Sequence, residues 1–126
     1  MKRNLGLIFL AFFWISVSEF FRNEFLLKQH WEEHYRSFGM NFPSDPENGA
    51  IWGIWSLCFS IVIYIISSKF SFFQSVLLSW TIGFILMWLV IGNLGVLPWT
   101  ILPYAVPLSI LEVWIAVLIL SKADRK

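Results

Sequence analysis

Four long apolar stretches dominate the pattern of hydrophobic and polar positions along the chain. They cover residues 5–21, 50–67, 72–91 and 99–120, and polar or turn-forming residues separate them. A helix needs about 20 mostly apolar residues to cross the roughly 30 Å hydrocarbon core of a bilayer, where its backbone groups must be hydrogen-bonded within the segment. The pattern therefore predicts an all-α integral membrane protein, a four-helix bundle that forms a single domain over residues 1–126.

Composition agrees with this class and excludes several others. Hydrophobic residues make up 58% of the chain and charged residues only 13%, which is too apolar for a small soluble domain. The formal net charge of +1, without a concentrated basic face, argues against a nucleic-acid partner. A single cysteine, Cys58, cannot form a disulfide or a thiolate metal cluster within the chain. We expect the lipid bilayer and either further copies of the chain or a larger membrane complex as partners, and no cofactor.

The flanks of the apolar stretches predict a retained first helix and an orientation. The N-terminal stretch resembles a signal peptide, but it continues into the large residues of SEFFRNEF without a small-residue cleavage site. Most basic residues then fall on one side of the membrane: Lys2, Arg3, Lys69, Lys122, Arg125 and Lys126, against Arg22, Lys28 and Arg36 on the other. Because cytoplasmic loops are enriched in Lys and Arg, we expect both termini in the cytoplasm and the protein in a plasma (inner) membrane.

Turn-forming residues mark where the helices begin and where they are interrupted. The sequence SDPE over residues 44–47 combines capping side chains, a first-turn proline and an acid, so it predicts the start of the second spanning helix. Gly49 and Gly53 form a GxxxG pair, for which we favour simple backbone clearance over close helix packing. Pro103 and Pro107 each remove a backbone donor, so the outer half of the fourth helix should be kinked or broken.

Residues 22–48 connect the first two spans and carry an amphipathic pattern. Ring-bearing and apolar residues recur at helical spacing and form one stripe: Leu27, His30, Trp31, His34, Tyr35 and Phe38. Charged residues occupy the opposite face. This pattern predicts an amphipathic helix that follows the first span and lies in the outer interface of the membrane.

The sequence HWEEH within this stripe raises the question of a metal site. It matches the HxxEH pattern of the inverzincin metalloproteases, in which two histidines bind zinc and the inner glutamate is the base, but the match covers five residues outside a soluble catalytic domain. His30, Glu33 and His34 remain candidates for a simpler metal site completed by another group. A pH-sensing role is a second alternative, since histidine titrates near neutrality. We favour a third, in which the two rings only edge the interfacial stripe.

Glu112 is the most informative residue, because it is the only charged residue between Lys69 and Lys122. It lies about 20 Å from the outer edge of its helix, where a charge costs at least about 3 kcal/mol, so we expect it to face the bundle interior or a subunit interface, or to be protonated. Uncharged side chains at similar depth are candidate partners: Trp14, Ser16, Ser60, Ser79, Trp80 and Thr81. Glu19 and Arg22, three positions apart, are expected to form a separate ion pair at the outer interface.

Three functional hypotheses follow from these residues. We favour a transporter or small-molecule-binding protein in which Glu112 is a proton or ligand site, with Ser60, Thr81, Trp14 and Trp80 nearby. Its cavity would be lined by Trp14, Trp80, Trp88 and Trp114. The alternative is a non-catalytic structural or accessory membrane subunit. A metal-dependent enzyme that uses His30, Glu33 and His34 at the outer interface is the third hypothesis, and it lacks a nucleophile motif and a cofactor fingerprint.

Overall fold

The computed structural model describes residues 1–123, and every regular element in that part of the chain is a helix. Four helices are long and apolar enough to cross a membrane: Lys2–Leu26, Pro46–Lys69, Phe72–Asn93 and Trp99–Leu120. Each predicted apolar stretch falls within one of them, so the prediction of an all-α bundle is confirmed. Arg125 and Lys126, which entered the charge argument, lie outside the described residues.

Short segments of other helix types interrupt three of the four spans. The elements are α1 (Lys2–Phe20), the π-helix η1 (Phe21–Leu26), α2 (Lys28–Arg36), α3 (Pro46–Lys69), α4 (Phe72–Trp80), the π-helix η2 (Thr81–Ile85), α5 (Leu86–Asn93), the 3-10 helix η3 (Trp99–Ile101) and α6 (Leu102–Leu120). The first span is thus α1 with η1, the third is α4 with η2 and α5, and the fourth is η3 with α6.

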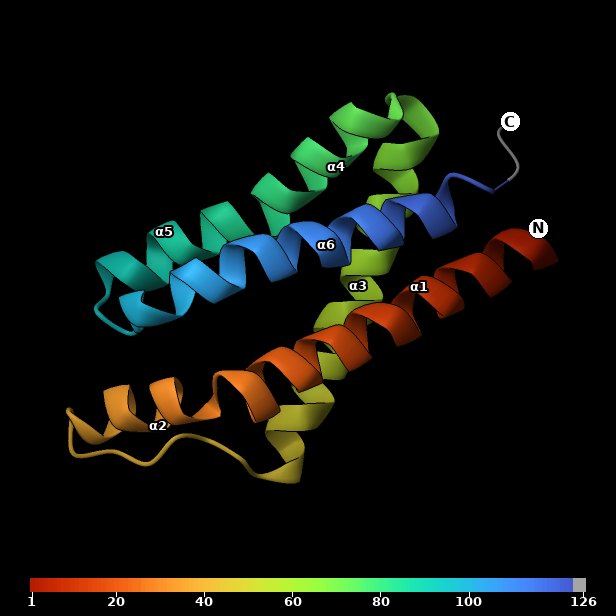
Figure 1. Cartoon of the computed structure of the whole chain (residues 1–126). Coiled ribbons are helices and arrows are strands. Elements are labelled where there is room, and N and C mark those ends of the chain that lie inside the picture. Colours follow the sequence, from red (N-terminus) through yellow and green to blue (C-terminus); the bar gives the residue numbers. More distant parts are fainter. Residues whose placement is uncertain (124–126) are drawn as a thin grey trace.

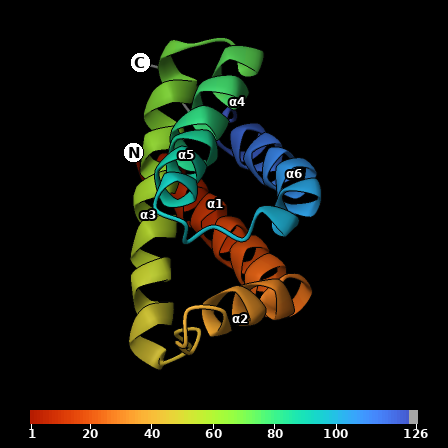
Figure 2. The ribbon, with the colours of Figure 1, turned by 90° about the vertical axis from the view of Figure 1, so that its left-hand side faces the viewer.

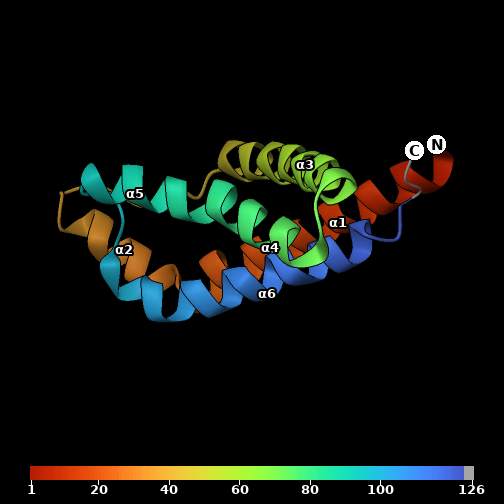
Figure 3. The same ribbon diagram turned by 90° about the horizontal axis from the view of Figure 1, so that it is seen from above.

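The helices are arranged so that the start of α1 and the end of α6 lie at the same end of the bundle (Figure 1). There the Arg3 side chain donates a hydrogen bond to the Lys122 backbone carbonyl at 3.2 Å. α1 packs against both α3 and α6, and α4 packs against α6. Seen from above, α3 and α6 lie on opposite sides of the molecule (Figure 3). Figure 2 shows α2 across the other end, beneath α1 and close to the start of α3.

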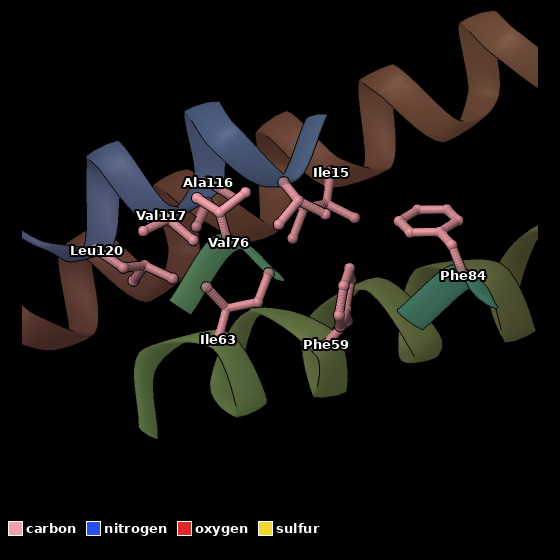
Figure 4. Close-up of a cluster of buried hydrophobic side chains, with 10 residues drawn as sticks. Ile15, Phe59, Ile63, Val76, Phe84, Ala116, Val117 and Leu120 are labelled. Atoms are coloured by element: carbon pink, nitrogen blue, oxygen red, sulfur yellow. The ribbon is translucent and has the colours of Figure 1, made fainter. Parts of the chain in front are cut away.

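Two apolar clusters hold these helices together. The larger joins α1, α3, α4, η2 and α6 (Figure 4): Ala11, Ile15, Phe59, Ile63, Val76, Phe84, Val113, Ala116, Val117 and Leu120. The smaller fastens the start of α2 to the turn before α6: Leu27, Leu97, Ile101 and Ala105. Leu27 opens the predicted amphipathic stripe and is almost fully buried. The predicted helix is therefore present, and its apolar face packs on protein at this point.

The predicted start of α3 is found, whereas the interruption of the fourth span lies before the two prolines that were predicted to cause it. Asp45 is the N-cap of α3 and Pro46 occupies the first turn, although no side-chain cap hydrogen bond forms. A Cβ added to Gly49 would meet no atom within 4 Å, so close helix packing does not explain this glycine within one chain. The break in the fourth span is the 3-10 turn η3; α6 then takes Pro103 into its first turn and continues through Pro107.

A buried cluster of three charged residues

Three charged side chains meet among the helices. Glu19 from α1 and Arg22 from η1 are each 5% exposed, and Glu112 from α6 is 0% exposed. Arg22 Nη2 donates a hydrogen bond to Glu19 Oε1, with 2.5 Å between the two atoms. Arg22 Nη1 lies 3.6 Å from Glu112 Oε1. The predicted Glu19–Arg22 ion pair is confirmed, but it is buried and not separate from Glu112, so the expectation of only uncharged partners for Glu112 was wrong. The long arginine side chain turns inward from η1 and joins the two carboxyls.

Two π-helical segments form the surroundings of the arginine. Arg22 lies in η1, and its guanidinium carbon is 5.1 Å from the centre of the Phe84 ring, which belongs to η2. Beside it, Gly83 leaves room for Phe59: a Cβ at this glycine would overlap the Phe59 ring. Such π-bulges frequently occur at functional sites. Here both of them contribute a side chain to the contact between cation and aromatic ring.

Glu19 has a full set of partners, whereas Glu112 does not. Asn23 Nδ2 donates to the Glu19 backbone carbonyl at 3.2 Å and to Glu19 Oε2 at 3.0 Å. Trp31 Nε1 in turn donates to Asn23 Oδ1 at 3.2 Å. Within residues 1–123, neither carboxyl oxygen of Glu112 nor Arg22 Nη1 has a hydrogen-bond partner. Arg22 is therefore shared unequally, with its strong contact on Glu19.

The cluster contains more acids than bases. Two carboxyls share one guanidinium, and no other charged group enters from the helices packed around them: α3 has charges only at its ends, Glu47 and Lys69, and residues 72–93 have none. With every group ionised the cluster would carry a net charge of −1. An uncompensated charge at such a place is costly, so the cluster favours one additional positive charge, either a proton or a bound cation.

The uncharged residues predicted as partners of the Glu112 carboxyl do not bind it. Trp14 Nε1 donates to the backbone carbonyl of Glu112 at 2.9 Å, not to its side chain. Trp80 Nε1 donates to a serine of α6 at 2.9 Å, and Ser60 donates to the backbone of its own helix at 2.8 Å. Thr81 is half-buried at the start of η2. Within residues 1–123, Trp14 is the only member of this group that hydrogen-bonds to Glu112, and it does so through the Glu112 backbone.

Two cavities meet at Glu19. The first, of about 290 Å³, reaches from Glu19 and Arg22 toward α2 and α5, and three tryptophans line it: Trp31, Trp52 and Trp88. The second, of about 520 Å³, lies between α1 and the first half of α3. We call this second cavity the lateral groove. Of the four tryptophans predicted to line a cavity, Trp88 lines the first of these two. The Trp80 ring lies 6.3 Å from the Trp88 ring, and Trp114 packs on the phenyl rings of residues 72 and 73.

The histidine pair has a different position and different contacts. His30 Nδ1 lies 3.0 Å from Thr100 Oγ1, and His34 Nε2 donates to the Gly95 backbone carbonyl at 2.7 Å. Glu33 Oε1 accepts a hydrogen bond from the side chain of residue 29 at 2.8 Å. Both rings thus fasten α2 to the turn between α5 and α6. In the part of the chain that the structure describes, no three His, Cys, Asp or Glu side chains cluster as metal ligands would.

Fold and site together define a class: a small all-α protein with four helices suited to cross a membrane and a charged cluster buried among them. No known protein family, curated protein or solved structure matches this chain. The functional argument therefore depends on the chemistry of the charged cluster and its two cavities.

Proposed function

We propose that this chain is a small membrane transporter or small-molecule-binding protein that exchanges a proton for a monovalent organic cation. The observation that carries the proposal is that two buried carboxyls, Glu19 and Glu112, share the single guanidinium of Arg22 beside a cavity. Such a cluster becomes neutral by holding one proton or one cation, which makes the two mutually exclusive.

The unequal contacts of Arg22 suggest how the exchange would proceed. Glu19 lines the 290 Å³ cavity and Glu112 does not, so an entering cation reaches Glu19 first. The cation competes there with Arg22, which is then free to pair with Glu112, whose oxygens have no hydrogen bond in the described chain. Glu112 gives up its proton as the guanidinium approaches. The tryptophans that line the cavity offer aromatic faces, which attract organic cations.

Calorimetric titration of the purified protein in a non-ionic detergent tests this exchange. Tetrapropylammonium is a suitable probe because it has no titratable group, so a released proton must come from the protein. Titrations in two buffers with different ionisation enthalpies should give about one proton released per cation bound, by linkage. Glu112→Gln should abolish the release, and the matched control Glu47→Gln, an exposed acid at the start of α3, should leave it unchanged.

Other results would overturn the proposal. The exchange is wrong if tetrapropylammonium does not bind the wild-type protein. It is also wrong if the wild type and Glu112→Gln bind the probe equally and neither releases a proton. A silent Glu112→Gln, together with a Glu112→Leu variant that no longer assembles, would favour the structural or accessory subunit. If Glu112→Gln fails to give a single monodisperse peak on size exclusion, Glu19→Gln provides the second variant and should also lose proton release.

We also propose a plasma-membrane location with both termini in the cytoplasm. The asymmetry of basic residues supports this orientation, and so does the position of the start of α1 and the end of α6 at the same end of the bundle (Figure 1). The same proposal places the chain in the lipid bilayer. Its protein partners would be further copies of the chain or a larger membrane complex.

A further inference from the structure

We infer that the lateral groove binds the alkyl chain of a single-chain cationic amphiphile that enters from the bilayer, with its ammonium group beside Glu19 and Glu24. This inference rests on the proposed cation exchange, for which it specifies the class of ligand. The apolar walls of the groove, its opening and the charge at one end each support it.

The groove has the size and walls of a site for a small amphiphile. Its volume of about 520 Å³ lies within the range of small-molecule sites. Gly49 and Gly53 form part of the α3 wall, and a Cβ on either would meet no atom within 4 Å. From Glu24 to Phe13 the α1 side extends about 16 Å, which suits a dodecyl chain.

The groove opens toward the side of the bundle where lipid would lie. Three apolar residues of α1 line it, and all three are exposed: Phe13 by 64%, Val17 by 46% and Phe20 by 69%. A membrane-spanning helix presents such side chains to acyl chains. An amphiphile dissolved in the bilayer therefore reaches the groove without first leaving the membrane.

One end of the groove is acidic. Glu19, Glu24 and Asp45 line it, and none of the Lys, Arg or His residues within residues 1–123 does. Arg22 lines only the neighbouring cavity, and the Lys28 ammonium lies 3.5 Å from Glu24 without lining the groove. The three acids outnumber the two bases paired with them, Arg22 on Glu19 and Lys28 on Glu24, so this end of the groove attracts an ammonium group and repels the phosphate of a phospholipid or the carboxylate of a fatty acid.

The aromatic contact and the position of Glu19 connect the groove to the charged cluster. Trp52 lines both the groove and the 290 Å³ cavity, and a cation–π contact to its ring would add to the binding of an ammonium group that reaches it. Glu19 also lines both. An ammonium group in the acidic end therefore competes with Arg22 for Glu19.

The test uses the full chain in phosphatidylcholine nanodiscs, titrated calorimetrically with dodecyltrimethylammonium against an empty-nanodisc baseline. We expect saturable binding at one site per chain, at least tenfold weaker in Gly53→Leu, which fills the groove. The matched control Gly6→Leu also places its side chain in open space, but on the other half of α1, and should bind as wild type does. Dodecyl sulfate should show no saturable binding.

The possible outcomes separate this inference from the proposed exchange. Saturable dodecyltrimethylammonium binding that Gly53→Leu weakens, without proton release, would support the groove and overturn the exchange. Proton-coupled binding of tetrapropylammonium, together with no saturable binding of the dodecyl probe, would support the exchange and overturn the groove. The groove inference would also be overturned if dodecyl sulfate bound as well as dodecyltrimethylammonium. It would likewise be overturned if a correctly folded Gly53→Leu variant bound dodecyltrimethylammonium as tightly as the wild type does. Gly49→Leu replaces Gly53→Leu if the latter does not fold.

Discussion

Replacing Arg22 by methionine should reveal how strongly the bundle depends on the charged cluster. Methionine keeps an unbranched side chain but removes the only cation between two buried carboxyls. Removing one partner of a buried ion pair costs about 3–5 kcal/mol, because the other charge is left uncompensated. Loss of the contact with the Phe84 ring adds about 0.5–2 kcal/mol. We therefore expect Arg22→Met to lower the free energy of unfolding by at least about 3 kcal/mol.

Lys28→Met provides the matched control, because it removes a cation from an ion pair with Glu24 in which both side chains are partly exposed. Such pairs contribute about 0–1 kcal/mol, so this variant should unfold almost as wild type does. Unfolding by sodium dodecyl sulfate in mixed micelles, followed by circular dichroism, measures both.

A second substitution makes the test more specific to charge. Adding Glu112→Gln to Arg22→Met removes one of the two stranded carboxyls, so the double variant should recover part of the lost stability. If Arg22→Met is no more destabilising than Lys28→Met, or if the double variant recovers nothing, then Arg22 does not hold the two carboxyls together as the contacts indicate.

Three further predictions concern packing, a single hydrogen bond and topology. Gly83→Ala should destabilise the protein by about 1–3 kcal/mol in the same unfolding assay, because its methyl group would overlap a phenyl ring of α3, whereas Gly53→Ala, in open space, should be neutral or slightly stabilising. Trp14→Phe should cost about 1 kcal/mol, since it removes the hydrogen bond from the indole N–H to a backbone carbonyl of α6. Ser44→Cys in a Cys58→Ser background should react with a membrane-impermeant maleimide on intact cells; reaction only after lysis would reverse the proposed orientation.

The spans themselves could be predicted from the sequence because bilayer thickness and backbone hydrogen bonding leave few alternatives for long apolar stretches. The start of α3 was equally local: a capping residue at position 45 and a proline at position 46 specify it without any contact to another helix. The amphipathic spacing of α2 likewise requires only its own side chains. In each of these cases, the controlling interactions lie within a few residues.

The charged cluster could not be predicted in the same way. The contact between Arg22 and Glu112 joins residues far apart in the chain, and it depends on η1 turning the arginine side chain inward. No local signal predicts a π-helical segment at that position. One indication was nevertheless present: a lone acid deep in an apolar helix requires a positive partner, and Arg22, with its long side chain, is the basic residue nearest to the membrane interior.

If the chain exchanges a proton as proposed, its buried cluster would also sense the electric field across the membrane. Glu112 lies about 60% of the way along the span from Trp99 to Leu120, so a proton reaching it from the α2 end crosses about that fraction of the membrane field. Each elementary charge that crosses the whole field gains or loses about 2.3 kcal/mol per 100 mV, so this proton gains or loses about 1.4 kcal/mol. A potential change of about 100 mV would therefore alter the proton affinity of the cluster about tenfold.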